Sequence, residues 1–175
     1  MNNFMIRKAE INDAEAIANL LFLAMEDILY AFIQERNKGK ALIFLNQFTA
    51  ASNNQYSFEN CYVGLIDEQI VACACLYDGA LLHQLRQPIK DYIEANYQAN
   101  FNPEDETQTG EIYLDCLGVD PNQQGKGLGS KMIHFLIDEI VVKKHDTLGL
   151  LVDEDNPHAK KLYLNLGFKS VGYQS

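Results

Sequence analysis

Apolar residues recur along this chain at two spacings, which separate predicted helices from predicted strands. Spacings of three and four residues run from Ile17 to Phe32 and predict a long helix, with Asn12 and Glu15 forming a capping box at its start. Further helices are predicted over residues 40–52, 129–144 and 157–166. Apolar or alternating segments predict strands over residues 4–10, 61–66, 69–77, 111–119, 148–152 and 168–173.

This order predicts one domain over residues 1–175 with a mixed α/β layer structure. Asp67 and Glu68 join the second and third strands as an antiparallel hairpin, whereas the late strand–helix–strand units predict parallel strands with right-handed crossovers. The wholly apolar segment 148–152 is typical of a central, buried strand. Residues 79–110 form an insert, in which a helix is expected just after Pro88. The apolar stripe of that helix is Ile89, Tyr92, Ile93 and Tyr97.

Composition and charge exclude several classes of protein. The 175 residues are 47% hydrophobic and 22% charged, and no apolar run approaches the roughly 18 residues of a membrane helix. The N-terminus lacks the long apolar segment of a secretory signal, so we expect a soluble, cytoplasmic protein with no membrane partner. A net charge of −10 argues against a nucleic-acid partner and permits a cationic one, such as an amine.

The four cysteines and four histidines show none of the spacings of a metal site. The chain has no CxxC motif, and its histidines at positions 83, 134, 145 and 158 are scattered, so no metal is predicted. Cys73 and Cys75 share one face of a predicted strand. We expect them to be reduced, buried thiols that pack as small apolar side chains.

A glycine-rich segment, "VDPNQQGKGLGSKM" over residues 119–132, lies between a predicted strand and a predicted helix. Such an arrangement presents free backbone N–H groups and the positive end of a helix to a phosphate. Two phosphate-binding motifs do not fit. A P-loop would need glycine in place of Asp120 and serine or threonine in place of Gly127. The dinucleotide fingerprint would need glycine in place of Ser130.

The hexapeptide from Gln124 to Gly129 has the form Q-x-x-G-x-G and resembles the acetyl-CoA pyrophosphate loop of the GNAT superfamily of N-acyltransferases, most of which carry arginine first. "NPHAKKLYLNLGF", Asn156 to Phe168, resembles the next motif of that family, N-x-x-A-x-x-L-Y-x-x-x-G-F. The resemblance implies a mixed, mostly antiparallel central sheet with splayed parallel fourth and fifth strands, flanked by helices. It also implies an N-acetyltransferase that moves the acetyl group of acetyl-CoA to a primary amine.

The resemblance also implies which residues bind acetyl-CoA. Leu117 and Val119 match the strand positions whose backbone pairs with the pantetheine arm, and Asn156 matches a residue hydrogen-bonded to that arm. Asn156 can equally be a plain helix cap, and the two roles are compatible. For Lys126, contact with the phosphates and simple solvation both stay open. The pyrophosphate cradle matches Gln124, Gly125, Lys126, Gly127, Leu128, Gly129 and Ser130.

For catalysis, Tyr163 matches the general acid that protonates the departing thiolate, and the N–H of Val119 is expected to stabilise the oxyanion. Glu111 is the first candidate for the general base and Asp115 the second. With regular alternation both share a strand face with Leu117, but a bulge would break that register. A solvated, non-catalytic carboxylate is an equal alternative. Direct transfer is the norm of the family, ahead of an acyl-enzyme on Cys116.

Two departures from the family pattern concern the acceptor side. The family usually ends in a hairpin, whereas this chain stops at Ser175, so the last strand is short, absent or supplied by the other subunit of a homodimer. The insert at 79–110 is hypothesised to cover the acceptor. A cationic small molecule and a peptide N-terminus are both open as acceptors. The alternative function is a non-catalytic acyl-CoA-binding sensor, while a nucleotide-binding oxidoreductase is disfavoured by the failed motifs.

Overall fold

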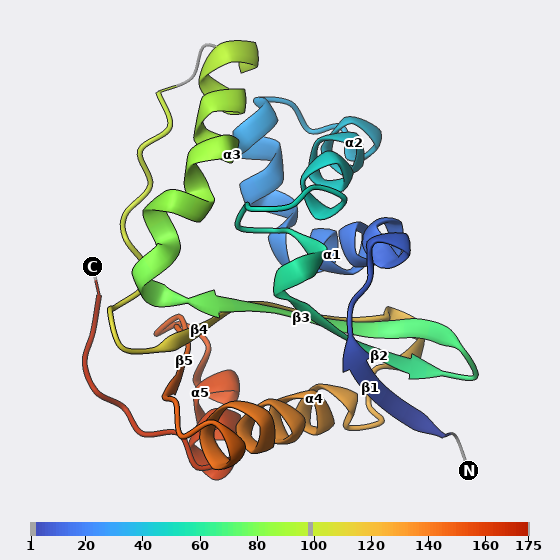
Figure 1. Cartoon of the computed structure of the whole chain (residues 1–175), viewed down its shortest axis with the longest axis vertical. Helices are drawn as coiled ribbons and strands as arrows, with labels where there is room; N and C mark the ends of the chain where they lie inside the picture. The colour runs from blue at the N-terminus through green and yellow to red at the C-terminus, as the bar shows by residue number, and fades with distance from the viewer. Residues whose placement is uncertain (1–2, 98–99, 175) are drawn as a thin grey trace.

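The computed structural model describes residues 3–97 and 100–174 of the chain (Figure 1). Its strands are β1 (Phe4–Lys8), β2 (Cys61–Ile66), β3 (Gln69–Asp78), β4 (Ile112–Val119) and β5 (Leu148–Gly149). Its α-helices are α1 (Ala14–Ile33), α2 (Lys38–Thr49), α3 (Leu82–Tyr97), α4 (Leu128–Leu136) and α5 (Pro157–Asn165). A π-helical turn, Ile137–Lys143, continues α4.

The strands form one five-stranded sheet in the order β1-β2-β3-β4-β5. The first four strands pair antiparallel, and Asp67 and Glu68 join β2 to β3 with positive φ angles of 49° and 67°, as a tight hairpin turn requires. β5 runs parallel to β4 and pairs with it only through Ile112–Leu148 and Tyr113–Gly149. The predicted mixed sheet with a splayed parallel pair is therefore confirmed.

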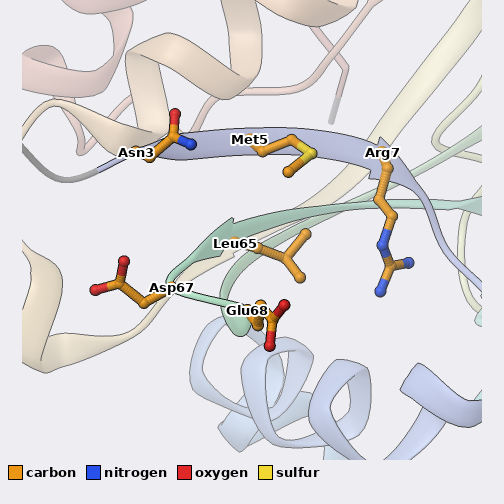
Figure 2. Close-up of a pocket in the computed structure, with 6 residues that line it drawn as sticks. All are labelled: Asn3, Met5, Arg7, Leu65, Asp67 and Glu68. Carbon is orange, nitrogen blue, oxygen red and sulfur yellow. The ribbon is translucent and has the colours of Figure 1, made fainter.

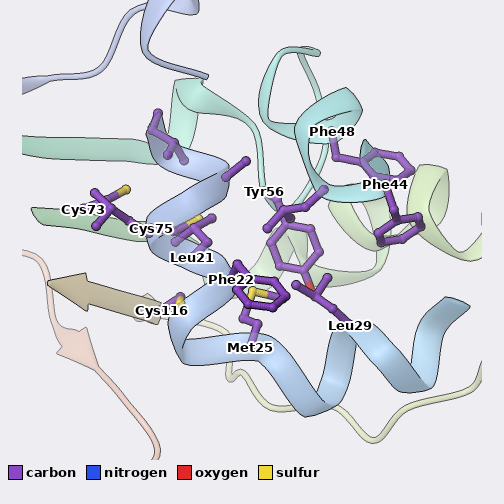
Figure 3. Packing of buried hydrophobic residues seen from close by; sticks show 14 of the residues in the cluster. Leu21, Phe22, Met25, Leu29, Phe44, Phe48, Tyr56, Cys73, Cys75 and Cys116 are labelled. Carbon is purple, nitrogen blue, oxygen red and sulfur yellow. The ribbon is translucent and has the colours of Figure 1, made fainter. Parts of the chain in front are cut away.

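Helices cover both faces of the sheet: α1, α2 and α3 lie on one side, and α4 and α5 on the other (Figure 1). Alternation along the strands sends apolar side chains to both layers. The cysteines at positions 61, 73, 75 and 116 are buried and free, and they pack in the layer of α1. Figure 3 shows Cys73, Cys75 and Cys116 beside that helix. The expectation of buried, reduced thiols is confirmed.

One helical segment is more apolar than the sequence analysis expected. Within Ile11–Ile33, a stretch of 18 residues has a mean hydropathy of 1.8, which by length and composition alone is enough to cross a membrane. This corrects the statement that no apolar run approaches that length. Ile17, Leu21 and Leu29 on this helix are fully buried against the sheet and α2. A helix in the core of a protein can have the same length and mean hydropathy as a membrane-spanning one.

Two predicted helix starts are wrong. The first is the Asn12–Glu15 capping box, because Glu10 and Asp13 form the capping box instead. Oδ2 of Asp13 accepts a hydrogen bond from the backbone N–H of Glu10 (2.8 Å), and Arg7 binds both carboxylate oxygens of Asp13 (2.7 and 3.1 Å). An ion pair from β1 therefore selects the first residues of the helix, which a local pattern does not show.

The second wrong start is that of α3, which begins at Leu82, so Pro88 lies inside the helix. Proline removes one N–H from the helical ladder, but Pro88 lies on the exposed side, where water can satisfy the freed carbonyl. The predicted stripe is confirmed: Ile89 and Ile93 are buried, and Tyr92 packs against Phe44 and Phe48 of α2 with ring centroids 5.6 and 5.7 Å apart. The stripe therefore belongs to the core.

The strand predictions at the C-terminal end of the chain are also corrected. β5 has two residues rather than five and forms an edge of the sheet instead of its centre. Residues 168–174 form no strand, which agrees with the open alternative that the last strand is absent. No strand among the described residues pairs with the outer edge of β5. Leu151 is 47% exposed, and Val171 farther along is 93% exposed.

Candidate functional site

The glycine segment forms a sharp turn between β4 and α4, as predicted. Gly125 and Gly127 adopt φ angles of +82° and +72°, a left-handed backbone that side-chain-bearing residues rarely adopt. Gly127 is the residue before the helix, and the first backbone bond back to it comes from Lys131 N–H (3.1 Å). The N–H groups of residues 128–130 therefore have no partner within the helix and point out of its positive end.

One edge of β4 is open beside this turn. Asp120 N–H bonds to Val71 of β3 (2.8 Å), so alternation turns the N–H groups of Leu117 and Val119 toward the opposite edge. β5 does not pair there, because its pairing with β4 ends at Tyr113. An extended ligand can pair with these groups as an additional strand would, as the resemblance implies for the pantetheine arm.

The turn, the open edge and α5 enclose a cleft of about 480 Å³. Nine of its eleven lining residues come from β4, the turn and the start of α4, and all but Gln123 are predicted cofactor-binding residues. Two more, His158 and Leu162, come from α5, and the sequence analysis missed both. They lie four residues apart on the helix that follows Asn156, so helical spacing places them on one face and could have identified them. The lining residues are Leu117, Val119, Gln123, Gln124, Gly125, Gly127, Leu128, Gly129, Ser130, His158 and Leu162.

Three further predicted residues do not line the cleft: Lys126 and Asn156 of the cofactor site, and Tyr163, the predicted general acid. Lys126 is exposed, and its Nζ donates to Gln123 Oε1 (2.7 Å). Asn156 caps α5 by accepting the N–H of Ala159 at 3.1 Å, which leaves its side-chain NH₂ group as a donor. Tyr163 is half-buried, packs edge-to-face on Phe168 (5.7 Å), and has its pKa raised by burial, so its phenol stays protonated.

On the other face of the sheet, a bulge reorients Asp115. Cys75 pairs with Cys116 and Leu76 with Leu114, so Asp115 is the extra residue of β4. The bulge breaks the regular alternation, and the Asp115 side chain does not share the face of Leu117. It points instead into the layer of α1 and α3, where its contacts lie.

The Asp115 carboxyl is held by two donors on one oxygen. Gln55 Nε2 and Tyr77 OH both donate to Oδ2, each at 2.9 Å. Loss of solvation raises the pKa of Asp115 to about 6, the two hydrogen bonds oppose that rise, and the charge of Glu106 adds to it. A carboxyl with a pKa near 6 is mostly ionised at neutral pH and readily takes up a proton.

Glu111, the first candidate base, lies elsewhere. Its Oε1 accepts the backbone N–H of Gln108 (3.1 Å), and a side chain on Gly149 would collide with its carboxylate. Glu111 therefore packs at the end of β4 where that strand is paired with β5, whereas Asp115 lies where the two strands separate. Of the two candidate carboxylates, only Asp115 lies next to the open edge.

A second cavity, of about 490 Å³, lies over the β1–β2 edge of the sheet (Figure 2). None of its lining residues belongs to the predicted site, and Arg7, the one cation among them, already pairs with Asp13. Among the described residues, no three His, Cys, Asp or Glu side chains are grouped to hold a metal ion.

The fold, the amide-lined turn and the open strand edge define an acyl-CoA-dependent transferase, and comparisons with known proteins give the family. The profile of the Acetyltransferase (GNAT) family matches residues 25–168. A spermine/spermidine N(1)-acetyltransferase from Bacillus subtilis (strain 168) is 32% identical over 105 residues, which are 56% of this chain and 68% of that protein. A mycothiol acetyltransferase from Beutenbergia cavernae is 41% identical over 63 residues, 36% of this chain and 20% of that protein.

A solved structure of an acetyltransferase shares 29% identity with this chain, with a TM-score of 0.80 and coverage of 96% of this chain and 90% of the other. The chain therefore belongs to the GNAT acetyltransferase family, and it is an N-acetyltransferase. Members of this family use acetyl-CoA. The resemblance read from the glycine turn and the Asn156 motif is confirmed.

Proposed function

We propose that this enzyme transfers the acetyl group directly from acetyl-CoA to a cationic primary amine within a ternary complex, with Asp115 as general base and Tyr163 as general acid. One observation carries the proposal. The cleft and the Asp115 carboxyl lie on opposite faces of β4, next to the place where β4 and β5 separate. The thioester of acetyl-CoA can enter between the separated β4 and β5 from the α4 side, where it can meet an amine that arrives from the α1–α3 side.

In the proposed reaction, Asp115 Oδ1 takes a proton from the ammonium group of the amine, and the freed nitrogen attacks the thioester carbonyl carbon. The N–H of Val119 stabilises the negative charge that develops on the carbonyl oxygen. The carbon–sulfur bond then breaks, and Tyr163 gives its phenolic proton to the departing thiolate. As the amide forms, the nitrogen loses its second proton to solvent. Tyr163 regains a proton from solvent, and Asp115 returns its own proton to solvent.

A covalent route through Cys116 is disfavoured by the environment of its thiol. Cys116 is buried in the layer of α1, and burial together with the charge of Asp115 raises its pKa well above the usual range. The thiolate is the nucleophilic form of cysteine, and a raised pKa suppresses it. These facts support direct transfer.

The acceptor side is acidic, which supports a cationic amine. Glu106, from the insert, accepts a hydrogen bond from Tyr113 OH (3.1 Å), and its charge acts on Asp115. The insert thus contributes to the acceptor side through residues after its helix, while the aromatic stripe of that helix packs in the core. The polyamine acetyltransferase of B. subtilis suggests a small polycation ahead of a peptide N-terminus. Cytoplasmic location and homodimer formation stay predictions.

The test measures release of free coenzyme A from acetyl-CoA over a panel of amines that includes spermidine. We expect Asp115→Asn to lower kcat/KM by roughly 100-fold or more, because general-base catalysis contributes about that much. The matched variant Glu111→Gln removes the other candidate carboxylate and should retain most turnover. Tyr163→Phe keeps the ring packing on Phe168, and we expect it to lower kcat while coenzyme A still binds.

Full activity in Asp115→Asn together with loss in Glu111→Gln would reverse the assignment of the base. Binding of coenzyme A without turnover of any amine would instead favour the non-catalytic sensor. Isothermal titration with coenzyme A, run on each variant, separates loss of binding from loss of chemistry.

A further inference from the structure

We propose that Gln55 is a positioning residue, which holds one oxygen of Asp115 so that the other oxygen faces the amine; this inference rests on the proposed function. Gln55 lies 60 positions before Asp115, in the connection between α2 and β2. In sequence, that connection is a mostly polar segment, SNNQYSFEN over residues 52–60. The structure shows that the loop is built into the core.

The loop is unusual because its polar side chains are buried. Asn54, Gln55 and Ser57 are only 1%, 4% and 1% exposed. Buried polar groups are costly unless they are hydrogen-bonded. Asn54 meets that need locally, since its side-chain NH₂ donates to the carbonyls of Phe48 (2.9 Å) and Ala51 (3.2 Å). These bonds fix the loop, whereas Gln55 directs its side chain away from it.

The backbone of Gln55 is held from two sides. Its N–H donates to the carbonyl of Leu85 on α3 (2.9 Å), and its carbonyl accepts from the Cys75 thiol on β3 (3.3 Å). Because the backbone of Gln55 is already fixed, its side chain loses little further conformational freedom when it hydrogen-bonds to Asp115. The amide NH₂ therefore reaches Oδ2 of Asp115 and the hydroxyl of Tyr77 (3.1 Å) at once.

The two donors divide the carboxyl of Asp115 into two unlike oxygens. Oδ2 accepts from both Gln55 and Tyr77, whereas no donor among the described residues bonds to Oδ1. In the described part of the chain no side-chain polar atom is both sealed from solvent and unpaired, so Oδ1, which has no partner, keeps some contact with solvent. The open oxygen is the one that can receive a proton from an amine.

Several charged groups shift the pKa of Asp115 alongside the hydrogen bond from Gln55. Glu106 raises the pKa of Asp115, while Arg86 on α3 and the bonds from Gln55 and Tyr77 lower it. Other titratable side chains that face the carboxyl are Tyr56 from the same loop, Cys75 on β3, and Tyr113 and Cys116 on β4. Since Gln55 is neutral, its removal changes the hydrogen bonding of Asp115 without changing the local charge.

The experiment follows the carboxyl itself by NMR. Protein labelled with carboxyl-¹³C aspartate is titrated between about pH 3 and 9, and the resonance missing from Asp115→Asn identifies Asp115. We expect a midpoint near 6 in the wild type. Gln55→Met removes the donor at similar volume and should move the midpoint up by about one unit, because a bond to the charged form is lost. Tyr77→Phe should move it in the same direction.

Thr49→Val is the matched control. Thr49 is fully buried and donates to the Ala14 carbonyl (2.9 Å), away from Asp115, so the variant should unfold earlier but keep the wild-type midpoint. A midpoint that stays unchanged in both Gln55→Met and Tyr77→Phe overturns the positioning role, even if Asp115→Asn is inactive. Failure of the proposed function would show separately, as full turnover in Asp115→Asn.

Discussion

At the scale of single residues, His158 is the side chain most clearly added by the structure to the cleft that we propose for acetyl-CoA. It extends from the first turn of α5 and lines the cleft across from the amide-rich turn. An imidazole there can bond to a phosphate or stack on an aromatic ring of the ligand. Either contact adds to the contribution of the backbone amides.

We expect His158→Ala to weaken coenzyme A binding by about three- to tenfold, because one hydrogen bond contributes roughly 1 kcal/mol. Isothermal titration calorimetry with coenzyme A measures the change. His134 offers a matched control, since it is exposed on α4 and does not line the cleft. Equal affinity in His158→Ala and the wild type would remove His158 from the site.

The sequence reveals the residues that line the cleft more readily than those that hold the Asp115 carboxyl. The turn from Gln124 to Gly129 was predictable because three glycines alternate within five residues, and the positive φ angles of Gly125 and Gly127 favour glycine. Gln55 was not predictable, because its partner lies 60 positions away and nothing in its neighbourhood marks it. The bulge at Asp115 is equally hidden, since it appears only when β4 is aligned with β3.

At the scale of elements, the glycine turn contains glycines with two different roles. Gly127 has a φ of +72° and no atom near the position of an added Cβ, so its need for glycine is conformational. Gly129 has an ordinary helical backbone, and its added Cβ would lie 4.0 Å from Leu117 and Val119 on the wall of the cleft. Its need for glycine would come from the ligand.

Gly127→Ala should therefore destabilise the unliganded enzyme by about 1 kcal/mol, because a side chain is strained in the left-handed region. Gly129→Ala should leave the unliganded stability nearly unchanged but weaken coenzyme A binding. Thermal unfolding with and without coenzyme A measures both effects. A stability loss in Gly129→Ala as large as that in Gly127→Ala would contradict the division of roles.

The elements themselves were largely predictable, because periodicity records which face of a segment is buried. The hairpin at Asp67–Glu68 and the helix after the glycine turn formed where the pattern placed them. The errors have a common cause. The start of α1 depends on Arg7, and the continuation of α3 through Pro88 depends on tertiary packing. The short β5 reflects the absence of a strand beside it in the described residues, which local apolarity does not indicate.

At the scale of the whole molecule, the sheet separates the proposed acetyl-CoA side from the proposed acceptor side. The cleft lies on the side of the sheet that α4 and α5 cover, and the Asp115 carboxyl bonds to Tyr77 on the side of α1–α3. Figure 1 shows these two helical layers on opposite faces of the sheet. Between them lies the part of β4 that β5 leaves unpaired. Placing an ionisable carboxyl in the apolar layer is costly in stability, and that cost should depend on pH.

Asp115 should make the folded protein less stable as pH rises. Its folded pKa is about 6 and its unfolded value about 3.8, so folding favours the protonated form. That contribution is fully present below about pH 4, declines as pH rises, and is lost above about pH 6. A difference of this size corresponds to roughly 2–3 kcal/mol. Asp115→Asn, which does not ionise, should therefore gain stability over the wild type at pH 8 but little at pH 4.

Urea unfolding of both proteins at pH 4, 6 and 8 measures this gain, and the difference in unfolding free energy should grow between the first two values and then level off. Asp13 provides the opposite control, because its bonds to Arg7 lower its pKa. The loss of stability in Asp13→Asn should be larger at pH 8 than at pH 4. A gain in Asp115→Asn that does not change with pH would mean that Asp115 is solvated as in the unfolded chain, and would count against its role as a tuned base.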